Sequence, residues 1–209
     1  MKSFHTEILT KKQEELLPLI KDFSKSFYLV GGTAIALHIG HRYSVDFDLF
    51  TSKNVIPGVI RNKIHRKKFK IDKYIFEEEG QAHYILNDVK VTFYSFPFEI
   101  RSFKKFKDII RIPDLLTLSA MKVFAISERN KWKDYVDLYF IFRDYFSIRQ
   151  VINKTNELFS DYNDRMFFEQ LAYFEDIDYS ENIEFIEKDP GMKNIKKFLL
   201  ELALNGFKQ

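Results

Sequence analysis

The chain has 209 residues, of which 45% are hydrophobic and 30% charged, and this balance predicts one soluble globular unit with a sizeable core. The absence of Cys excludes disulfides, thiolate metal sites and cysteine nucleophiles, so any metal should be held by oxygen ligands. A formal net charge of only +3 does not by itself indicate a nucleic-acid binder.

In the N-terminal half, hydrophobic periodicity predicts helices and short strands in alternation. Helices are expected over residues 6–23, over 33–39 between Gly32 and Gly40, and over 56–64, where Pro57 suits the first turn. Strands are expected at 27–30 and 45–50. Three further strands, at 73–78, 81–86 and 89–96, should form an antiparallel meander whose second turn is Asn87-Asp88.

In the C-terminal half, the apolar periodicity is helical almost throughout, with Pro190 and Gly191 marking the break before the last helix. We therefore predict an α+β protein: a small mixed or antiparallel sheet flanked by helices, followed by a helical C-terminal half. Residues 1–111 should form the core with the sheet, and residues 112–209 a helical region packed on it. The helices are expected at 113–127, 132–145, 148–159, 165–174 and 193–204.

The N-terminal segment, residues 1–17, mixes charged residues with isolated apolar ones. It has no continuous apolar run, so we expect neither a signal peptide nor a membrane-spanning helix there. The sequence predicts a cytoplasmic protein without membrane partners.

Two clusters of basic residues interrupt the chain. Either could follow a phosphate backbone, but local lysine runs more often serve to keep a helix face or an edge strand in solution. The first cluster consists of Arg61, Lys63, His65, Arg66, Lys67, Lys68, Lys70 and Lys73, and the second of Arg101, Lys104, Lys105, Lys107 and Arg111.

Gly31 and Gly32 lie between a predicted strand and a predicted helix. Such a turn exposes backbone N–H groups at the start of the helix, and no Cβ prevents a phosphate from approaching them. Paired glycines also occur in ordinary tight turns, so this feature alone is weak evidence of phosphate binding.

Asp46 and Asp48 are two residues apart in the next predicted strand, so their side chains should project from one face. Their oxygens could share a hard divalent cation such as Mg²⁺ or Mn²⁺. The alternative is a solvent-facing strand with incidental acids. The combination with the glycine turn favours the metal, because nucleotidyl transfer needs phosphate donors and a charge-neutralising cation side by side.

These residues resemble a known family. The runs Val30-Gly31-Gly32-Thr33-Ala34 and Gly40 to Phe50, the latter with Arg42, Ser44 and the two aspartates, are similar to the first motif of the nucleotidyltransferases related to DNA polymerase beta. More narrowly, they resemble the AbiEii toxin family of type IV toxin-antitoxin and abortive-infection systems. Downstream, Ala120-Met121-Lys122, Arg129, Lys133-Asp134 with Asp137 and Leu138, and Leu171 to Asp176 resemble the family's later motifs and helical tail.

The resemblance implies an NTP substrate, with the NMP passing to a hydroxyl acceptor on an RNA such as tRNA or on a protein, and an antitoxin as partner. The residues expected to bind the nucleotide are Gly31, Gly32, Thr33, Arg42, Ser44, Lys122 and Arg129; those expected to be catalytic are Asp46, Asp48, Lys122 and Asp134, with the metal on Asp46 and Asp48.

Lys122 and Arg129 are seven residues apart, about two helical turns, so a continuous helix would place them on one face near Asp134. There they could offset triphosphate charge, while Asp134 orients one of them or accepts the proton of the incoming hydroxyl. An internal ion-pair network that ties the helices together is the alternative.

Thr92 marks one departure from the superfamily pattern. Active members place a third carboxylate on a later strand beside the first pair, but here the expected strand position carries Thr92, which has neither charge nor useful basicity. Asp88 and Glu99 lie at the ends of that stretch, at the wrong height or face. Two further hypotheses therefore stay open: a weak or inactive nucleotide- or RNA-binding protein on the same scaffold, and a partner-binding domain without a nucleotide site.

Overall fold

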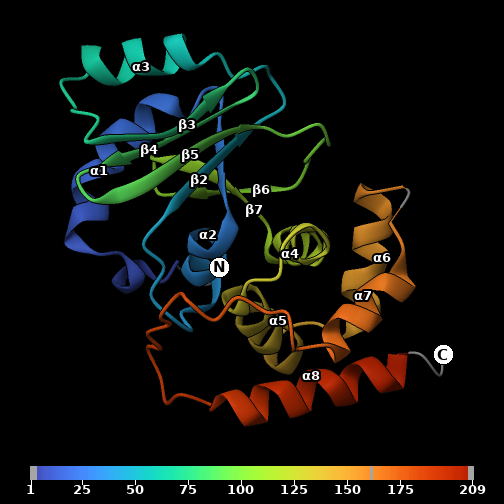
Figure 1. Cartoon of the computed structure of the whole chain (residues 1–209). Coiled ribbons are helices and arrows are strands. Elements are labelled where there is room, and N and C mark those ends of the chain that lie inside the picture. Colours follow the sequence, from blue (N-terminus) through green and yellow to red (C-terminus); the bar gives the residue numbers. More distant parts are fainter. Residues whose placement is uncertain (1–3, 161, 207–209) are drawn as a thin grey trace. The chain divides into compact units, whose positions relative to one another are not determined.

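The computed structural model describes residues 4–160 and 162–206, and Figure 1 shows the chain. The protein divides into two compact units, Met1–Asp114 and Leu115–Gln209. The first carries the sheet and the second is helical, which confirms the predicted α+β class. The first three residues of the N-terminal segment lie outside the described part. Within the described ranges, no helix is long and apolar enough to cross a membrane.

The N-terminal unit alternates helices with short strands. Its elements are η1 (Thr6–Ile8), α1 (Lys11–Phe23), β1 (Tyr28–Val30), α2 (Gly31–Ile39), β2 (Phe47–Thr51), α3 (Pro57–Arg66), β3 (Lys73–Glu78), β4 (Gln81–Leu86), β5 (Val89–Ser95), β6 (Phe103–Phe106) and β7 (Ile110–Pro113).

Five of these strands form one mixed sheet in the order β1-β2-β5-β4-β3. The predicted antiparallel meander of β3, β4 and β5 is confirmed, and Asn87 and Asp88 form its second turn with positive φ angles of 51° and 60°. β2 pairs with β5 in parallel and with β1 in antiparallel orientation. β2 therefore lies between β1, which leads into the glycine turn, and β5, the last strand of the meander.

The two faces of this sheet differ in polarity. One face is apolar and buried along β2, β4 and β5, and α1 packs on it through Phe23, whose ring centroid lies 4.8 Å from that of Phe93. α3 lies on the same face, where Arg61 forms an ion pair with Glu77 of β3. The other face carries half-buried polar side chains. The buried side chains of the apolar face are Phe47, Leu49, Ala82, Tyr84, Leu86, Val91 and Phe93.

The predicted boundaries need correction at three places. The first α-helix begins at Lys11 rather than residue 6, because Thr10 and Gln13 form a capping box that starts a new helix after the 3-10 turn. β2 begins at Phe47, so Val45 is 55% exposed instead of facing the core. The β6–β7 hairpin was not predicted, because its exposed lysines hide the alternation of apolar residues.

The C-terminal unit contains five helices in its described residues: α4 (Leu115–Glu128), α5 (Trp132–Asp144), α6 (Ile148–Leu158), α7 (Asp164–Ala172) and α8 (Met192–Gly206). α4 packs against α5, α6 and α7, and α7 packs against α8. Ser147 caps α6 with a capping box, Asn163 caps α7, and Gly191 supplies a φ of 80° before α8. α4 is therefore the central helix of this unit.

Candidate functional site

The turn between β1 and α2 leaves the start of the helix without a side-chain cap. Val30 occupies the N-cap position and makes no side-chain hydrogen bond, and α2 begins directly at Gly31, whose φ is 73°. The first N–H groups of a helix have no partner inside the helix, and they carry the positive end of its dipole. This turn can therefore donate hydrogen bonds to an anionic ligand.

The two glycines are also required by close approaches of the protein's own side chains. A Cβ on Gly31 would lie 2.2 Å from Oδ2 of Asp48, and a Cβ on Gly32 would lie 2.5 Å from Nη2 of Arg42. Both distances are far below van der Waals contact. Because neither glycine has a side chain, the Asp48 carboxylate and the Arg42 guanidinium can lie directly against the backbone that should hold the phosphates.

Asp48 lies at the centre of these contacts. It pairs with Val30 of β1 on one side and with Thr92 of β5 on the other, and Asp46 directly precedes the strand. Both aspartates are half-buried. In the described residues no group of three or more His, Cys, Asp or Glu could hold a metal ion. Two carboxylates suit one hard cation that completes its oxygen shell with water or phosphate.

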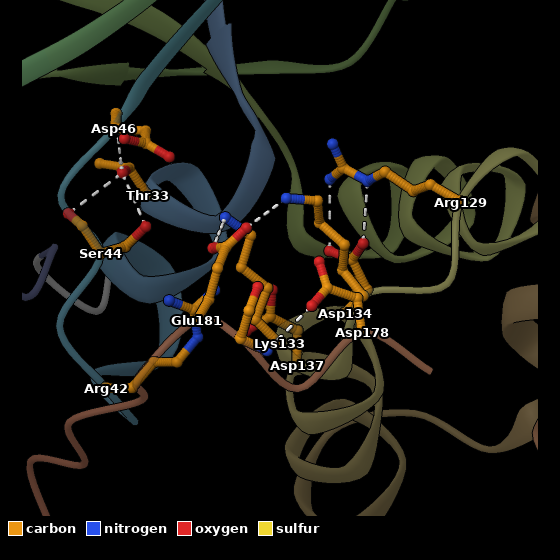
Figure 2. A network of polar contacts seen from close by, with 12 residues as sticks. Thr33, Arg42, Ser44, Asp46, Arg129, Lys133, Asp134, Asp137, Asp178 and Glu181 are labelled. Atoms are coloured by element: carbon orange, nitrogen blue, oxygen red, sulfur yellow. Dashed lines mark hydrogen bonds and ion pairs between the residues drawn. The ribbon is translucent and has the colours of Figure 1, made fainter. Parts of the chain in front are cut away.

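The loop that carries Asp46 is fastened to α2 by Thr33 (Figure 2). The Thr33 hydroxyl lies 3.0 Å from Oγ of Ser44 and hydrogen-bonds to the backbone oxygen of Asp46. Gln13 of α1 donates from Nε2 to the Ser44 backbone oxygen at 2.8 Å. Thr33 and Ser44 are both buried. Their hydroxyls therefore position the aspartate loop, and direct nucleotide contact by them stays a prediction.

Arg42 belongs to the same loop and is buried. Its Nη1 donates to the backbone oxygen of Tyr43 at 2.9 Å, while Nη2 lies against Gly32. A buried guanidinium beside an uncapped helix start adds positive charge where phosphate oxygens would lie. The structure thus brings Gly31, Gly32, Arg42 and Asp48 together.

The position of Thr92 agrees with the sequence argument. It stands directly beside Asp48 in the parallel register, where a third carboxylate was expected, and it is buried. Asp88 lies in the β4–β5 turn and pairs with Lys12 at 2.5 Å, and Glu99 pairs with Arg101 at 2.8 Å. Neither acid therefore replaces the missing group.

In the C-terminal unit, Lys122 of α4 forms the centre of a buried ion-pair cluster; Figure 2 shows its partners Asp134 and Asp137. Its Nζ lies 2.6 Å from Oδ1 of Asp134 and 2.9 Å from Oδ2 of Asp137, both on α5. Arg129 donates from Nε to Oδ2 of Asp134 at 3.0 Å. Lys122 is 4% exposed and the two aspartates are completely buried, whereas Arg129 is 48% exposed.

These contacts fix the charge state of the cluster. Burial opposes charge on Lys122, but the carboxylates of Asp134 and Asp137 outweigh it and raise the pKa of the lysine. Burial also opposes charge on Asp134, but Lys122 and Arg129 outweigh it and lower the pKa of this carboxyl. An ionised carboxylate with both oxygens engaged is a poor proton acceptor. The geometry therefore favours Asp134 as the group that orients Lys122 and Arg129.

Lys133, at the start of α5, is engaged by a distant part of the sequence. Glu181 forms ion pairs with both Lys131 and Lys133. The segment that precedes Glu181 is held by backbone bonds, from Trp132 N to Asp178 O at 3.0 Å and from Asp178 N to the Asn130 oxygen at 2.7 Å. The sequence did not predict the ion pairs of Glu181, because no periodicity relates a loop residue to a helix start that lies far earlier in the chain.

Several members of the two basic clusters are engaged by the protein itself. In the first, Arg61 pairs with Glu77, Lys67 pairs with Asp22, and Lys63 donates to the Asp22 backbone oxygen. In the second, Arg101 pairs with Glu99, as described above, and the Arg111 guanidinium lies 4.7 Å from the centroid of the Phe103 ring. These contacts favour a solvated-surface interpretation for the residues that make them, and they do not involve Lys73.

Comparison with solved structures identifies the fold. Over 93% of both chains, the fold matches a crystal structure from H. pylori described as that of a nucleotidyltransferase, with a TM-score of 0.55 and 17% identity. JHP933 from Helicobacter pylori matches over 99% of this chain and 100% of its own, with a TM-score of 0.57 and 16% identity. MenT4, a nucleotidyltransferase toxin from Mycobacterium tuberculosis H37Rv, matches over 92% of this chain and 81% of its own, with a TM-score of 0.57 and 12% identity. The chain therefore has a nucleotidyltransferase fold.

The family follows from the sequence comparison. Residues 19–205 match the model of the nucleotidyl transferase AbiEii toxin family of the type IV toxin-antitoxin system, and the chain belongs to this family. An uncharacterized protein of Aquifex aeolicus (strain VF5) is 30% identical over 141 residues, which cover 65% of this chain and 68% of the relative. The suspected resemblance is thereby confirmed.

Proposed function

We propose that this protein transfers a nucleoside monophosphate from an NTP to a hydroxyl acceptor, either an RNA such as tRNA or a protein, and releases pyrophosphate. One observation carries the proposal: the uncapped start of α2 at Gly31 lies in direct contact with the carboxylate of Asp48. Phosphate donors and a site for a cation adjoin there, and nucleotidyl transfer needs both. Membership in a nucleotidyltransferase toxin family supports the same reaction.

The chemical step breaks one bond and forms one. The acceptor oxygen attacks the α-phosphorus, the bond from this phosphorus to the β-phosphate oxygen breaks, and pyrophosphate leaves with its electron pair. The acceptor's proton passes to a base or to water. The N–H groups of Gly31 and Gly32 and the Arg42 guanidinium would hold phosphate oxygens, because all three lie at the uncapped helix start.

Asp46 and Asp48 are the residues that would hold Mg²⁺ or Mn²⁺. Their oxygen-only donor set fits one such ion, which would neutralise phosphate charge when bound. Lys122, Arg129 and Asp134 stay predicted site residues. Binding of a triphosphate by Lys122 requires an exchange of partners, since Asp134 and Asp137 already engage its ammonium group.

Labelled NTPs test the proposal directly. The purified protein is incubated with each α-labelled NTP, Mg²⁺ and either tRNA or no RNA, so that transfer to RNA and to protein are both detected. Asp48→Asn should reduce transfer by about 100- to 1000-fold, the usual loss when one charge-stabilising group is removed. Asp88→Asn is the matched control, because Asp88 is 75% exposed and lies in a turn. Equal transfer by Asp48→Asn and wild type contradicts the assignment.

Toxicity and an antitoxin partner are proposed from the family alone. Expression of the wild-type chain should arrest growth of its host, and Asp48→Asn should relieve the arrest at equal protein level. Growth arrest by both chains alike would separate toxicity from nucleotidyl transfer.

A second candidate function is a nucleotide- or RNA-binding protein with little turnover. Thr92 favours it, because this hydroxyl stands beside Asp48 where an acid would complete the site. Here NTP binding, measured by calorimetry with Mg²⁺, should persist without transfer. A large gain of transfer in Thr92→Asp would support this candidate, and efficient transfer by wild type would exclude it.

A further inference from the structure

A row of side chains leads away from the aspartate site across the half-buried face of the N-terminal sheet. Strand register places Asp48 beside Thr92, Thr92 beside His83, and His83 beside Phe76. Paired residues of neighbouring strands project to one face, so these four side chains form one line. With neighbouring strands about 4.8 Å apart, the line extends about 14 Å from Asp48 to the sheet edge.

The far end of this row is an unusual surface for a sheet edge. Phe76 is 44% exposed on the edge strand β3, and its ring meets that of His83 edge-on, with centroids 5.8 Å apart and an interplanar angle of 86°. An exposed aromatic ring beside a second ring offers a face on which a flat ligand can stack.

A basic row runs parallel to the first. Lys90 pairs with Ile85, and Ile85 pairs with Lys73, so both lysines project from the same face as Phe76 and His83. Lys73 is exposed and Lys90 half-buried. Glu78 is the acid on this face of β3, and its carboxylate hydrogen-bonds to the Gln81 amide. Aromatic rings next to lysines are the combination that binds single-stranded nucleic acid.

His83 has a defined hydrogen-bonding state. The side-chain amide N–H of Gln81 donates to Glu78, so the amide oxygen of Gln81 faces His83. This oxygen can only accept a hydrogen bond. Nε2 of His83 therefore carries the proton and donates to it at 3.1 Å. Nδ1 is then an acceptor. Burial, and after it the charge of Lys90, lowers the pKa of His83, so the ring is neutral at neutral pH. A neutral acceptor can bind a ribose hydroxyl, the group that distinguishes RNA from DNA.

The direction of attack on the α-phosphate indicates where the acceptor should bind. In-line attack requires the acceptor to approach the α-phosphate from the side opposite to the pyrophosphate. If the triphosphate lies at the turn after β1, the acceptor comes from the side of β5, β4 and β3. The row of Thr92, His83 and Phe76 is the surface on that side.

We propose that Thr92, His83 and Phe76, with Lys90 and Lys73, form the subsite that holds the 3′-terminal nucleotides of a single-stranded RNA acceptor. The assignment rests on the proposed nucleotidyl transfer and names its acceptor surface. Phe76 stacks on a base, His83 accepts a hydrogen bond from a 2′-hydroxyl, and the lysines bind the backbone phosphates.

Binding without NTP tests the subsite independently of transfer. A fluorescent single-stranded RNA oligonucleotide with 4-thiouridine at its 3′ end is titrated with the full chain, then irradiated, and the crosslinked peptide is identified by mass spectrometry. We expect crosslinks on β3, β4 or β5. Phe76→Ala should weaken binding by roughly 5- to 150-fold, the loss typical of one stacked base. A DNA oligonucleotide of the same sequence should bind more weakly, and His83→Phe should remove this preference.

Tyr74→Ala is the matched control. Tyr74 is 51% exposed on the same strand, but it pairs with Tyr84 and therefore faces the opposite side of the sheet. It should bind RNA like wild type. Phe76→Leu provides a second variant that keeps an apolar side chain without a ring, in case the alanine variant fails to fold.

The possible outcomes separate this inference from the proposed function. RNA crosslinked to the three strands without any NMP transfer supports the subsite and rejects the function. Transfer to RNA with an unchanged acceptor KM in both Phe76 variants overturns the subsite and leaves the function intact. Transfer to protein alone, with no binding of single-stranded RNA, also overturns it.

Discussion

The two polar clusters of this protein, one in each unit, differ in how they treat their charges. In the N-terminal unit, Asp46 and Asp48 are half-buried and lie beside an uncapped helix start. In the C-terminal unit, Lys122 and Asp134 are buried and neutralise one another. The first arrangement places partly exposed carboxylates beside the start of a helix, whereas the second buries its charges against one another.

This difference distinguishes a ligand-binding site from a clamp, by which we mean an ion-pair cluster that holds α4 and α5 together. A half-exposed carboxylate gives up little when it binds a cation, because water already shares its coordination. A buried ion pair must be broken before either partner can bind anything else, and a single buried charge without a partner is costly. We therefore expect changes in the first cluster to affect chemistry and changes in the second to affect stability.

The largest effect on stability should come from Asp134→Asn. The change removes one of the two carboxylates that neutralise the buried Lys122 and replaces the ion pair with Arg129 by a contact to a neutral amide, so unfolding free energy should fall by about 3–5 kcal/mol. Asp144→Asn on the same helix is the control: it removes an ion pair with Arg143 that is more than one-third exposed and should cost at most about 1 kcal/mol. Denaturant unfolding measures both. Equal losses would show that the buried cluster is not a clamp.

Gly31→Ala should be next in size and should affect chemistry as well. Alanine at a φ of 73° costs about 1–2 kcal/mol, and its Cβ would lie 2.2 Å from Oδ2 of Asp48, so the carboxylate must move. Gly80→Ala carries the same backbone penalty at a φ of 95°, with no atom nearer than 3.9 Å. Both should lose comparable stability in thermal melts, while only Gly31→Ala loses NMP transfer. Unimpaired transfer in Gly31→Ala would contradict the role of this contact.

A smaller, matched pair of changes compares the stability of the two units. Thr10 and Ser147 each form a capping box, at α1 in the N-terminal unit and at α6 in the C-terminal unit. Replacement of either by alanine should cost about 1 kcal/mol. Hydrogen exchange read by mass spectrometry should show the loss of protection confined to the unit that carries the change. Loss of protection in both units from either variant would mean that they unfold together.

Acidification should affect the two units in different pH windows. Burial lowers the pKa of both His38 and His83, so neutral histidine contributes stability above about pH 6.5, and this contribution is lost as the pH falls through the lowered values. Asp134, whose pKa is lowered by its cationic neighbours despite burial, keeps its contribution until the pH falls below about 3.8.

The N-terminal unit should therefore lose protection first on acidification, with the C-terminal unit following at much lower pH. Hydrogen exchange between pH 7 and pH 3 measures the order. His38 Nε2 donates to the Pro113 backbone oxygen at 2.9 Å, so His38→Gln keeps a donor while it removes the titration. This variant should reduce the loss that begins below about pH 6.5, and an unchanged profile would exclude His38 as a source.

The sequence by itself determined what depends on neighbours in the chain. Alternation located β3, β4 and β5, and helical periodicity located the helices of both units; that Asp46 and Asp48 project from one face stays a prediction, because β2 begins only at Phe47. The Asn87-Asp88 turn fixed the register of β5 against β4, because such a turn leaves the flanking strands one way to pair.

Only the tertiary structure decided which of these elements meet. The parallel pairing of β2 with β5 brings Asp48 beside Thr92, and no local pattern specifies which strand becomes the partner of another. Likewise, the need for glycine at position 31 follows from the Asp48 carboxylate against its backbone, and Lys122 becomes a clamp because α5 supplies two carboxylates to it. Local periodicity records which side of an element is apolar, whereas long-range packing determines what that side touches.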